Sequence, residues 1–173
     1  GNDQRMSDER MEAGRNFANK LWNASRFALG MVEVGEDLTL AAAGEMPVED
    51  RWVLSRLNQV TGNVERLLGR FELAEALRQT RDFFWDEFAD WYIEVAKVRV
   101  REGDRTPVPV LVHVMDRTLR LLHPFMPFVT EEIWSRLSTI SPDPEGAESL
   151  IVARYPSADE GRIDEEAERQ FEA

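Results

Sequence analysis

Apolar residues recur at helical spacing along most of this chain. A helix turns once every 3.6 residues, so side chains three or four positions apart fall on one face. The clearest series with that spacing is Val53, Leu57, Val60, Val64, Leu67 and Phe71. It predicts one buried stripe on a helix of about 20 residues.

Two more helices follow from the same spacing. The stripe Phe17, Leu21, Ala24 and Ala28 predicts a first helix from near Ser7, a favoured capping residue, to about Val32. A longer helix over residues 73–101 is predicted by Leu73, Leu77, Thr80, Phe84, Phe88, Trp91, Val95 and Val98. Residues 33–47, which contain two glycines and a proline, are expected to form a loop between the first two helices.

Residues 107–122 fit two patterns. Valines alternate at 108, 110, 112 and 114, as in a strand, whereas Leu111, Met115, Thr118 and Leu122 step at helical spacing. We predict a helix, because residues 115–122 continue only the second pattern. Pro107 also suits the first turn of a helix.

Two prolines break the chain after this segment. Pro124 and Pro127 each push the preceding residue into an extended conformation, which predicts a corner. Pro127 can open a fifth helix that turns Val129, Ile133, Trp134 and Leu137 inward. His123 stands at the corner, where a capping or packing role is expected.

These elements predict an all-α fold, an antiparallel bundle of about five helices. Residues 150–153 are expected to add a short extended segment near the C-terminus. We expect residues 1–156 to form the bundle and residues 157–173 to form an acidic tail that ends in the start of a helix.

Composition excludes several kinds of site. The 173 residues contain no cysteine and two histidines, and neither Gly-rich phosphate-loop motif occurs. A di-metal bundle would need a Glu-x-x-His motif, but Glu131 is followed three positions later by Trp134. Asp86, Asp90 and Glu94 are therefore expected to be a solvated acidic face that pairs with arginines. No catalytic residue, metal site or membrane span is predicted.

Charge is uneven along the chain. The net charge is −12, which by itself argues against a nucleic-acid partner. However, residues 33–50 hold six acidic and no basic residues, and residues 141–173 hold ten acidic and three basic ones. Basic residues concentrate at 51–70 and 97–120, and residues 13–32 hold three of them with no carboxylate.

The first predicted helix carries two lines of polar, basic and aromatic residues beside its buried stripe. One line is Arg15, Asn19, Trp22 and Arg26, and the other is Asn16, Lys20, Asn23 and Phe27. Arginine and lysine can hold phosphates, asparagine amides can bond base edges, and aromatic rings can stack on unpaired bases. RNA binding is thus one interpretation. The other is that Trp22 and Phe27 simply flank the core.

Four motifs in order resemble the anticodon-binding domain of valyl-tRNA synthetases. They are the Arg-Asn-Phe-x-Asn-Lys run within residues 14–27, Asp-Arg-Trp-Val-Leu-Ser-Arg-Leu-Asn at 50–58, Phe-Trp-Asp-Glu-Phe-Ala-Asp-Trp-Tyr-Ile-Glu at 84–94, and His-Pro-Phe-Met-Pro-Phe-Val-Thr-Glu-Glu-Ile-Trp at 123–134. The resemblance covers about residues 1–156. Trp85, Trp91 and Trp134 lie in these motifs at helical spacing, and we expect them in the core.

The resemblance implies a role in gripping the anticodon arm of a tRNA. It implies a parent enzyme that joins valine to tRNA using ATP and magnesium. This chain would be non-catalytic, because the family's His-Ile-Gly-His and Lys-Met-Ser-Lys-Ser motifs do not occur in it. The residues carried over as tRNA-binding are Arg15, Asn16, Asn19, Lys20, Asn23, Arg26 and Phe27. Arg26 and Phe27 are expected to stack on bases, Asn23 or Asn16 to bond a base edge, and Arg15 and Lys20 to contact phosphates.

Two other hypotheses remain open at this point. The domain could come from an isoleucyl-tRNA synthetase, which shares the domain type, or the chain could be an acidic helical scaffold for protein partners. The favoured interpretation is a cytoplasmic monomer that binds the anticodon stem-loop of a tRNA and binds neither DNA nor membranes.

Overall fold

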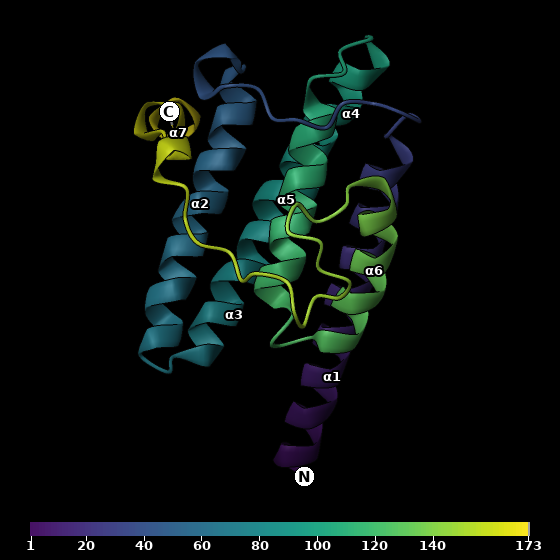
Figure 1. Cartoon of the computed structure of the whole chain (residues 1–173). Helices are drawn as coiled ribbons and strands as arrows, with labels where there is room; N and C mark the ends of the chain where they lie inside the picture. The colour runs from purple at the N-terminus through teal and green to yellow at the C-terminus, as the bar shows by residue number, and fades with distance from the viewer. Residues whose placement is uncertain (173) are drawn as a thin grey trace.

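The computed structural model describes residues 1–172, and they form a bundle of helices (Figure 1). Its α-helices are α1 (Asn2–Gly30), α2 (Val48–Gly69), α3 (Leu73–Asp82), α4 (Ile93–Arg101), α5 (Pro107–Leu122), α6 (Pro127–Ile140) and α7 (Glu165–Glu172). Three short elements are η1 (Ala43–Glu45), the π-helix η2 (Phe83–Tyr92) and η3 (Glu160–Arg162). The all-α fold is confirmed. Within residues 1–172 there is no strand, and no helix is both long and apolar enough to cross a membrane.

Five long helices make up the bundle, as the sequence predicts, because α3, η2 and α4 follow one another without a break. The centre is α5, which packs against α1, α2, α3, α4 and α6. Val108, Val110, Val112 and Val114 are all buried, and so are Leu111, Met115 and Leu119. The alternating valines therefore belong to a helix whose buried apolar surface is much wider than a single stripe.

Helix α1 buries the predicted stripe. Phe17, Leu21, Ala24 and Ala28 are each at most 7% exposed. The helix begins at Asn2, however, and not near Ser7. Residues 1–12 are exposed, and the first turns project beyond the bundle (Figure 1). Neither glycine nor proline interrupts residues 2–13, so the helix continues upstream of the possible cap at Ser7.

The π-helix shifts the buried face of the long helix. Hydrogen bonds in a π-helix run from residue i to i+5, so each turn holds more residues than in an α-helix. Beyond η2 the buried residues are Ile93 and Ala96, whereas Val98 is 49% exposed. The predicted stripe is wrong at this end, because it assumed α-helical spacing throughout. It is also wrong at the other end, where Leu73 is 53% exposed.

Phe71 lies outside the core, although the apolar series includes it. It follows the C-terminus of α2, is 88% exposed and has a φ of 59°. The Glu72 N–H donates to the Leu67 carbonyl at 2.9 Å, and the Phe71 N–H donates to the Leu68 carbonyl at 3.1 Å. These two bonds form a Schellman motif, whose left-handed position usually holds glycine.

The C-terminal segment packs along α2 (Figure 1). The Asp159 N–H donates to the Asn58 side chain at 2.8 Å, and the Asp164 N–H donates to the Ser55 hydroxyl at 2.7 Å. Phe171 lies 5.0 Å from Trp52 and 4.8 Å from Trp91 between ring centroids.

Residues 150–153 form a turn and not the expected extended segment. In this turn the Ala153 N–H donates to the Ser149 carbonyl.

A buried carboxylate joins α2, η2 and α4. Asp50 is 1% exposed and accepts a hydrogen bond from the Tyr92 hydroxyl at 2.6 Å. Arg99 donates to both Asp50 oxygens, at 2.6 and 3.1 Å. Burial and the neighbouring Asp50 carboxylate raise the pKa of Tyr92 well above its usual value, so the hydroxyl stays protonated and keeps donating.

Replacing Phe71 with glycine should stabilise the protein. A left-handed conformation strains any residue with a Cβ atom, and the exposed phenyl ring contributes little packing. We expect Phe71→Gly to raise the free energy of unfolding by roughly 0.5–1 kcal/mol in urea titrations. Phe71→Ala is the matched control, because it removes the ring and keeps the strain. An equal gain from both variants would contradict this explanation.

Removing the Asp50 carboxylate should destabilise the bundle strongly. Asp50→Ala leaves the Arg99 guanidinium largely buried without its main partner, and we expect a loss of about 3–5 kcal/mol in the free energy of unfolding. Tyr92→Phe removes one hydrogen bond to the same carboxylate, and a smaller loss of about 1.5–3 kcal/mol is expected. If Tyr92→Phe proved the more damaging change, packing around the ring would dominate over the ion pair.

Candidate nucleic-acid interface

Helix α1 presents its polar lines to solvent. Its inner face packs against α5, α6 and η2. Among the seven residues proposed to bind tRNA, the exposed ones are Arg15, Asn16, Asn19, Asn23 and Arg26. They lie at positions that are not part of the buried stripe, so helical spacing alone brings them onto one outer ridge. We call these five residues the α1 ridge.

Lys20 and Phe27 lie beside this ridge and are half-buried. The Lys20 ammonium forms an ion pair with Asp90 of η2 and lies 5.1 Å from the centroid of the Trp85 ring. The Phe27 ring lies against the core, and the Lys97 ammonium of α4 is 4.6 Å from its centroid. Lys97 also donates to Glu94 at 2.8 Å. The structure therefore engages both side chains in contacts within the protein.

A shallow groove of about 540 Å³ runs along the other side of the ridge, between α1 and α6. Residues of both helices line it: Asn19, Trp22, Asn23, Arg26, Glu132 and Arg136. The Arg136 guanidinium lies 4.8 Å from the centroid of the half-buried Trp22 ring. Its side chain is 59% exposed and lies 3.8 Å from Glu132. The groove thus combines an aromatic surface, two amides and two guanidinium groups.

Sequence reasoning did not assign Arg136 or Lys97 to this region. Lys97 belongs to the basic segment 97–120, but nothing in the sequence connects that segment to Phe27. Arg136 stands on a helix far from α1 in the chain. Only the packing of α6 beside α1 brings the two arginines, Arg26 and Arg136, to one groove.

The arrangement suits unpaired RNA in three ways. Each exposed asparagine amide offers a donor and an acceptor to a base edge. A guanidinium is always charged and binds phosphate oxygens through paired N–H donors. The ridge and the surfaces on its two sides hold the cations Arg15, Lys20, Arg26, Lys97 and Arg136 against the carboxylates Asp90, Glu94 and Glu132. This surface is therefore locally positive on a chain of net charge −12.

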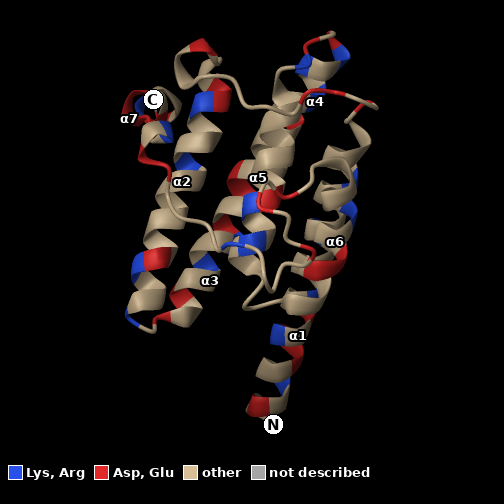
Figure 2. Ribbon diagram, in the orientation of Figure 1, with Lys and Arg blue, Asp and Glu red and all other residues tan. Residues whose placement is uncertain are grey.

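Charged residues of both signs are interspersed along the helices (Figure 2). In the predicted acidic face, Asp90 and Glu94 pair with lysines and not with arginines.

Within residues 1–172, no three His, Asp or Glu side chains gather as a metal site. His123 packs at the proline corner, where its Nδ1 lies 3.0 Å from the Thr130 hydroxyl.

The three tryptophans predicted to be core residues differ in burial. Trp134 is 1% exposed, so that prediction is confirmed. Trp85 and Trp91 are only half-buried, and they pack against the core from its edge. Trp85 stacks on Phe17 with ring centroids 6.3 Å apart.

Known proteins resemble this chain in amino-acid sequence and in fold. Over 169 residues, the chain is 52% identical to the valine–tRNA ligase of Dehalococcoides mccartyi, a match that takes in 97% of this chain. It is 47% identical to the enzyme of that name from Enterococcus faecalis over 177 residues and 99% of the chain, and 44% identical to that of Bacillus subtilis over 96%. In each case the chain spans only 19% of the relative's own length.

A solved structure supports the fold. The LeuRS chain of a LeuRS–tRNA–LeuAMS ternary complex from Agrobacterium radiobacter superposes with a TM-score of 0.59 at 22% identity. The superposition covers 88% of this chain and 17% of that one. At this identity the likeness concerns the arrangement of the helices alone.

Residues 50–173 match the family described as the anticodon-binding domain of tRNA ligase. The match takes in most of the bundle, from the first turn of α2 onward, whereas α1 and its ridge precede it. The relatives at 44–52% identity extend across α1 as well, because they cover at least 96% of the chain. The chain therefore belongs to the family of anticodon-binding domains of tRNA ligases.

Proposed function

We propose that this chain is the anticodon-recognition domain of a valine–tRNA ligase and that it binds the anticodon stem-loop through the α1 ridge and the groove beside it. The observation that carries the proposal is the exposed ridge of amides and guanidinium groups on α1. No carboxylate occurs between residues 13 and 32, so nothing on this helix segment repels a phosphate backbone.

Each group of residues has a proposed role. Arg15 at the ridge and Lys20 beside it contact phosphates, and Asn16, Asn19 and Asn23 bond the edges of unpaired bases. Arg26 stacks on a base, with the adjacent Phe27 completing the platform at its exposed edge. Arg136 and Trp22 extend this surface onto α6, since they already stack on one another beside Arg26.

The proposal extends to the parent enzyme. The relatives named valine–tRNA ligase support a parent that attaches valine to its tRNA with ATP and magnesium. No residue of this chain is assigned to either cofactor, and the domain itself holds the tRNA and performs no chemistry. We propose that it works as a monomer in the cytoplasm.

Binding to the anticodon stem-loop of valine tRNA should depend on the α1 ridge. We expect Arg26→Ala and Phe27→Leu each to weaken binding by about 1–3 kcal/mol, because each removes a surface that stacks on a base. Leucine keeps much of the packing of Phe27 against the core. Fluorescence titration at two salt concentrations measures the affinity and, from the slope, the number of phosphates engaged.

Arg101→Ala is the matched control for this titration. Arg101 is an exposed arginine at the end of α4 and lies outside the groove. Its removal should leave the affinity nearly unchanged. Should Arg26→Ala and Phe27→Leu behave like Arg101→Ala, both in this chain and in a complete valine–tRNA ligase that carries it, the assignment of the site would be wrong.

The identity of the anticodon should matter as well. Replacing the valine anticodon with the isoleucine anticodon in the same stem-loop should weaken binding at least about tenfold if the asparagine amides read base edges. Asn23→Ala should reduce this preference more than it reduces affinity for the wrong loop. A stronger affinity for the isoleucine loop would favour an isoleucyl enzyme. Equal affinity for both loops would mean that the domain contacts only the backbone.

A further inference from the structure

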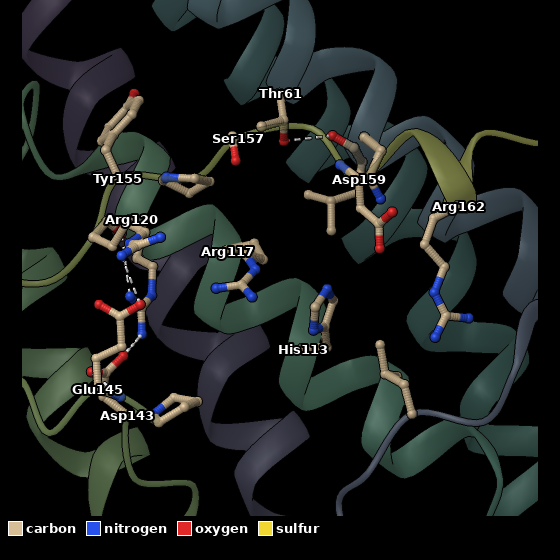
Figure 3. A pocket seen from close by; sticks show the side chains of 16 residues that line it. Thr61, His113, Arg117, Arg120, Asp143, Glu145, Tyr155, Ser157, Asp159 and Arg162 are labelled. Atoms are coloured by element: carbon tan, nitrogen blue, oxygen red, sulfur yellow. Dashed lines mark hydrogen bonds and ion pairs between the residues drawn. The ribbon is translucent and has the colours of Figure 1, made fainter.

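A second pocket lies among α2, α5 and the chain that leads to α7 (Figure 3). Its volume is about 250 Å³, and none of the described residues of α1 lines it. Four arginines line it, namely Arg117, Arg120, Arg154 and Arg162. They come from α5, from the loop after α6 and from η3, so only the folded chain brings them together.

Two of these arginines each form an ion pair with a carboxylate of the pocket lining. Arg120 is 4% exposed and donates to Asp116 at 2.9 Å and to Asp143 at 2.6 Å. Arg154 lies 3.1 Å from Glu145. The pair of Arg120 with Asp143 attaches the loop after α6 to α5, at one side of the pocket (Figure 3). Arg120 therefore has little capacity for a ligand, whereas Arg154 is 76% exposed and forms only a surface ion pair.

The other two arginines lack a good acceptor. Arg117 approaches Asp116 at 3.3 Å, through an oxygen that already accepts from the Arg120 Nε. Arg162 donates to the Met46 sulfur at 3.6 Å, and a thioether is a weak acceptor. Their side chains lie on either side of the His113 ring (Figure 3). Most of the forked donors of both groups therefore remain available for an oxyanion.

The local field in this part of the pocket is positive. Burial first, and then the charges of Arg117, Arg162 and Arg120, together lower the pKa of His113 to about 3. The ring is therefore neutral near pH 7 and offers one N–H donor. An anion bound between Arg117 and Arg162 would offset their positive charges and so raise the pKa of His113.

Asp159 limits the charge that the pocket can accept. Its carboxylate also lines the pocket and accepts the Gly161 N–H at 3.0 Å, the cap of η3. It pairs with no arginine or lysine among the described residues. A ligand with one or two negative charges therefore fits better than a polyphosphate. Ligand sites for drug-sized molecules run to roughly 300–1,000 Å³, so this smaller volume suits a compact molecule.

We propose that this pocket binds the phosphate group of a small phosphorylated molecule, held by the guanidinium groups of Arg117 and Arg162 and by an N–H of His113. The two arginines supply paired donors to the phosphate oxygens, and the imidazole donates from between them. The site is independent of the α1 ridge, and the proposal does not depend on tRNA binding.

Inorganic phosphate is the first probe, read by NMR of the two histidines at constant ionic strength set with chloride. We expect a saturable shift of the His113 ring signals, a rise in the pKa of His113 and no change at His123. Glycerol 3-phosphate should bind in the same way, whereas glycerol should not. A shift that chloride reproduces, or equal shifts at both histidines, would overturn the proposal.

Four variants define the site by the sign of their effects. Arg117→Gln and Arg162→Gln should each weaken phosphate binding about tenfold, because each removes a charged pair of donors. Asp159→Asn should tighten it severalfold, since the amide oxygen can still cap η3 while the opposing charge is gone. Arg101→Gln, on the exposed end of α4, should change nothing. Weaker binding in Asp159→Asn would contradict the proposed position of the anion.

Two further measurements separate a binding defect from a folding defect and a small ligand from RNA. Arg162→Lys keeps the charge but loses the planar fork, so it should bind phosphate more tightly than Arg162→Gln and less tightly than the natural protein. Phosphate and the anticodon stem-loop should bind together without competition. If the stem-loop displaced phosphate, or if Arg162→Gln weakened only RNA binding, the pocket would be part of an RNA surface instead.

Discussion

Burial of α5 is the constraint from which the rest of the bundle follows. This helix is apolar on every side except the one that carries His113, Asp116, Arg117 and Arg120, so it is stable only when other helices surround it. Five helices, α1, α2, α3, α4 and α6, pack against it. Each of them then needs only one apolar stripe, and its outer face is free of packing requirements. The polar ridge of α1 is a direct consequence, because Phe17, Leu21, Ala24 and Ala28 supply all the burial that this helix needs.

The net charge of the chain does not describe the charge of the α1 ridge. Acidic residues that contribute most of the −12 lie in residues 33–50 and 141–173, away from the ridge along the sequence. Exposed charges are screened within about 10 Å at moderate salt, so an RNA loop bound at the proposed site on α1 would respond mainly to the nearby cations. The acidic remainder disfavours non-specific contact with nucleic acid elsewhere on the molecule. The net charge of −12 is therefore no argument against the proposed RNA partner, because it does not describe the charge near α1.

Features that depend on local spacing were predictable from the sequence. The α1 stripe and the exposure of Asn16, Asn19 and Asn23 both follow from the helical repeat, and the structure agrees. Phe71 and Val98 were mispredicted, because a helix cap and a π-helical stretch each changed the repeat. Arg136 was missed because its place beside Trp22 depends on how two distant helices pack. The roles of the ridge residues toward RNA stay predictions.

The arginines of this chain fall into two classes, those that the fold pairs with carboxylates and those that it leaves without a close carboxylate. Arg99 and Arg120 are largely or fully buried, donate to two carboxylates each and so serve the stability of the bundle. Arg26 is exposed, and Arg136 and Arg162 have weaker acceptors or longer contacts. A guanidinium cannot lose its charge at neutral pH, so one without a close carboxylate gains most from an external anion. The sequence contains 19 arginines and two lysines and does not distinguish these classes. The packing of the helices around α5 separates the two classes. It brings Arg26 and Arg136 to the groove beside α1, and Arg117 and Arg162 to the pocket between α2 and α5.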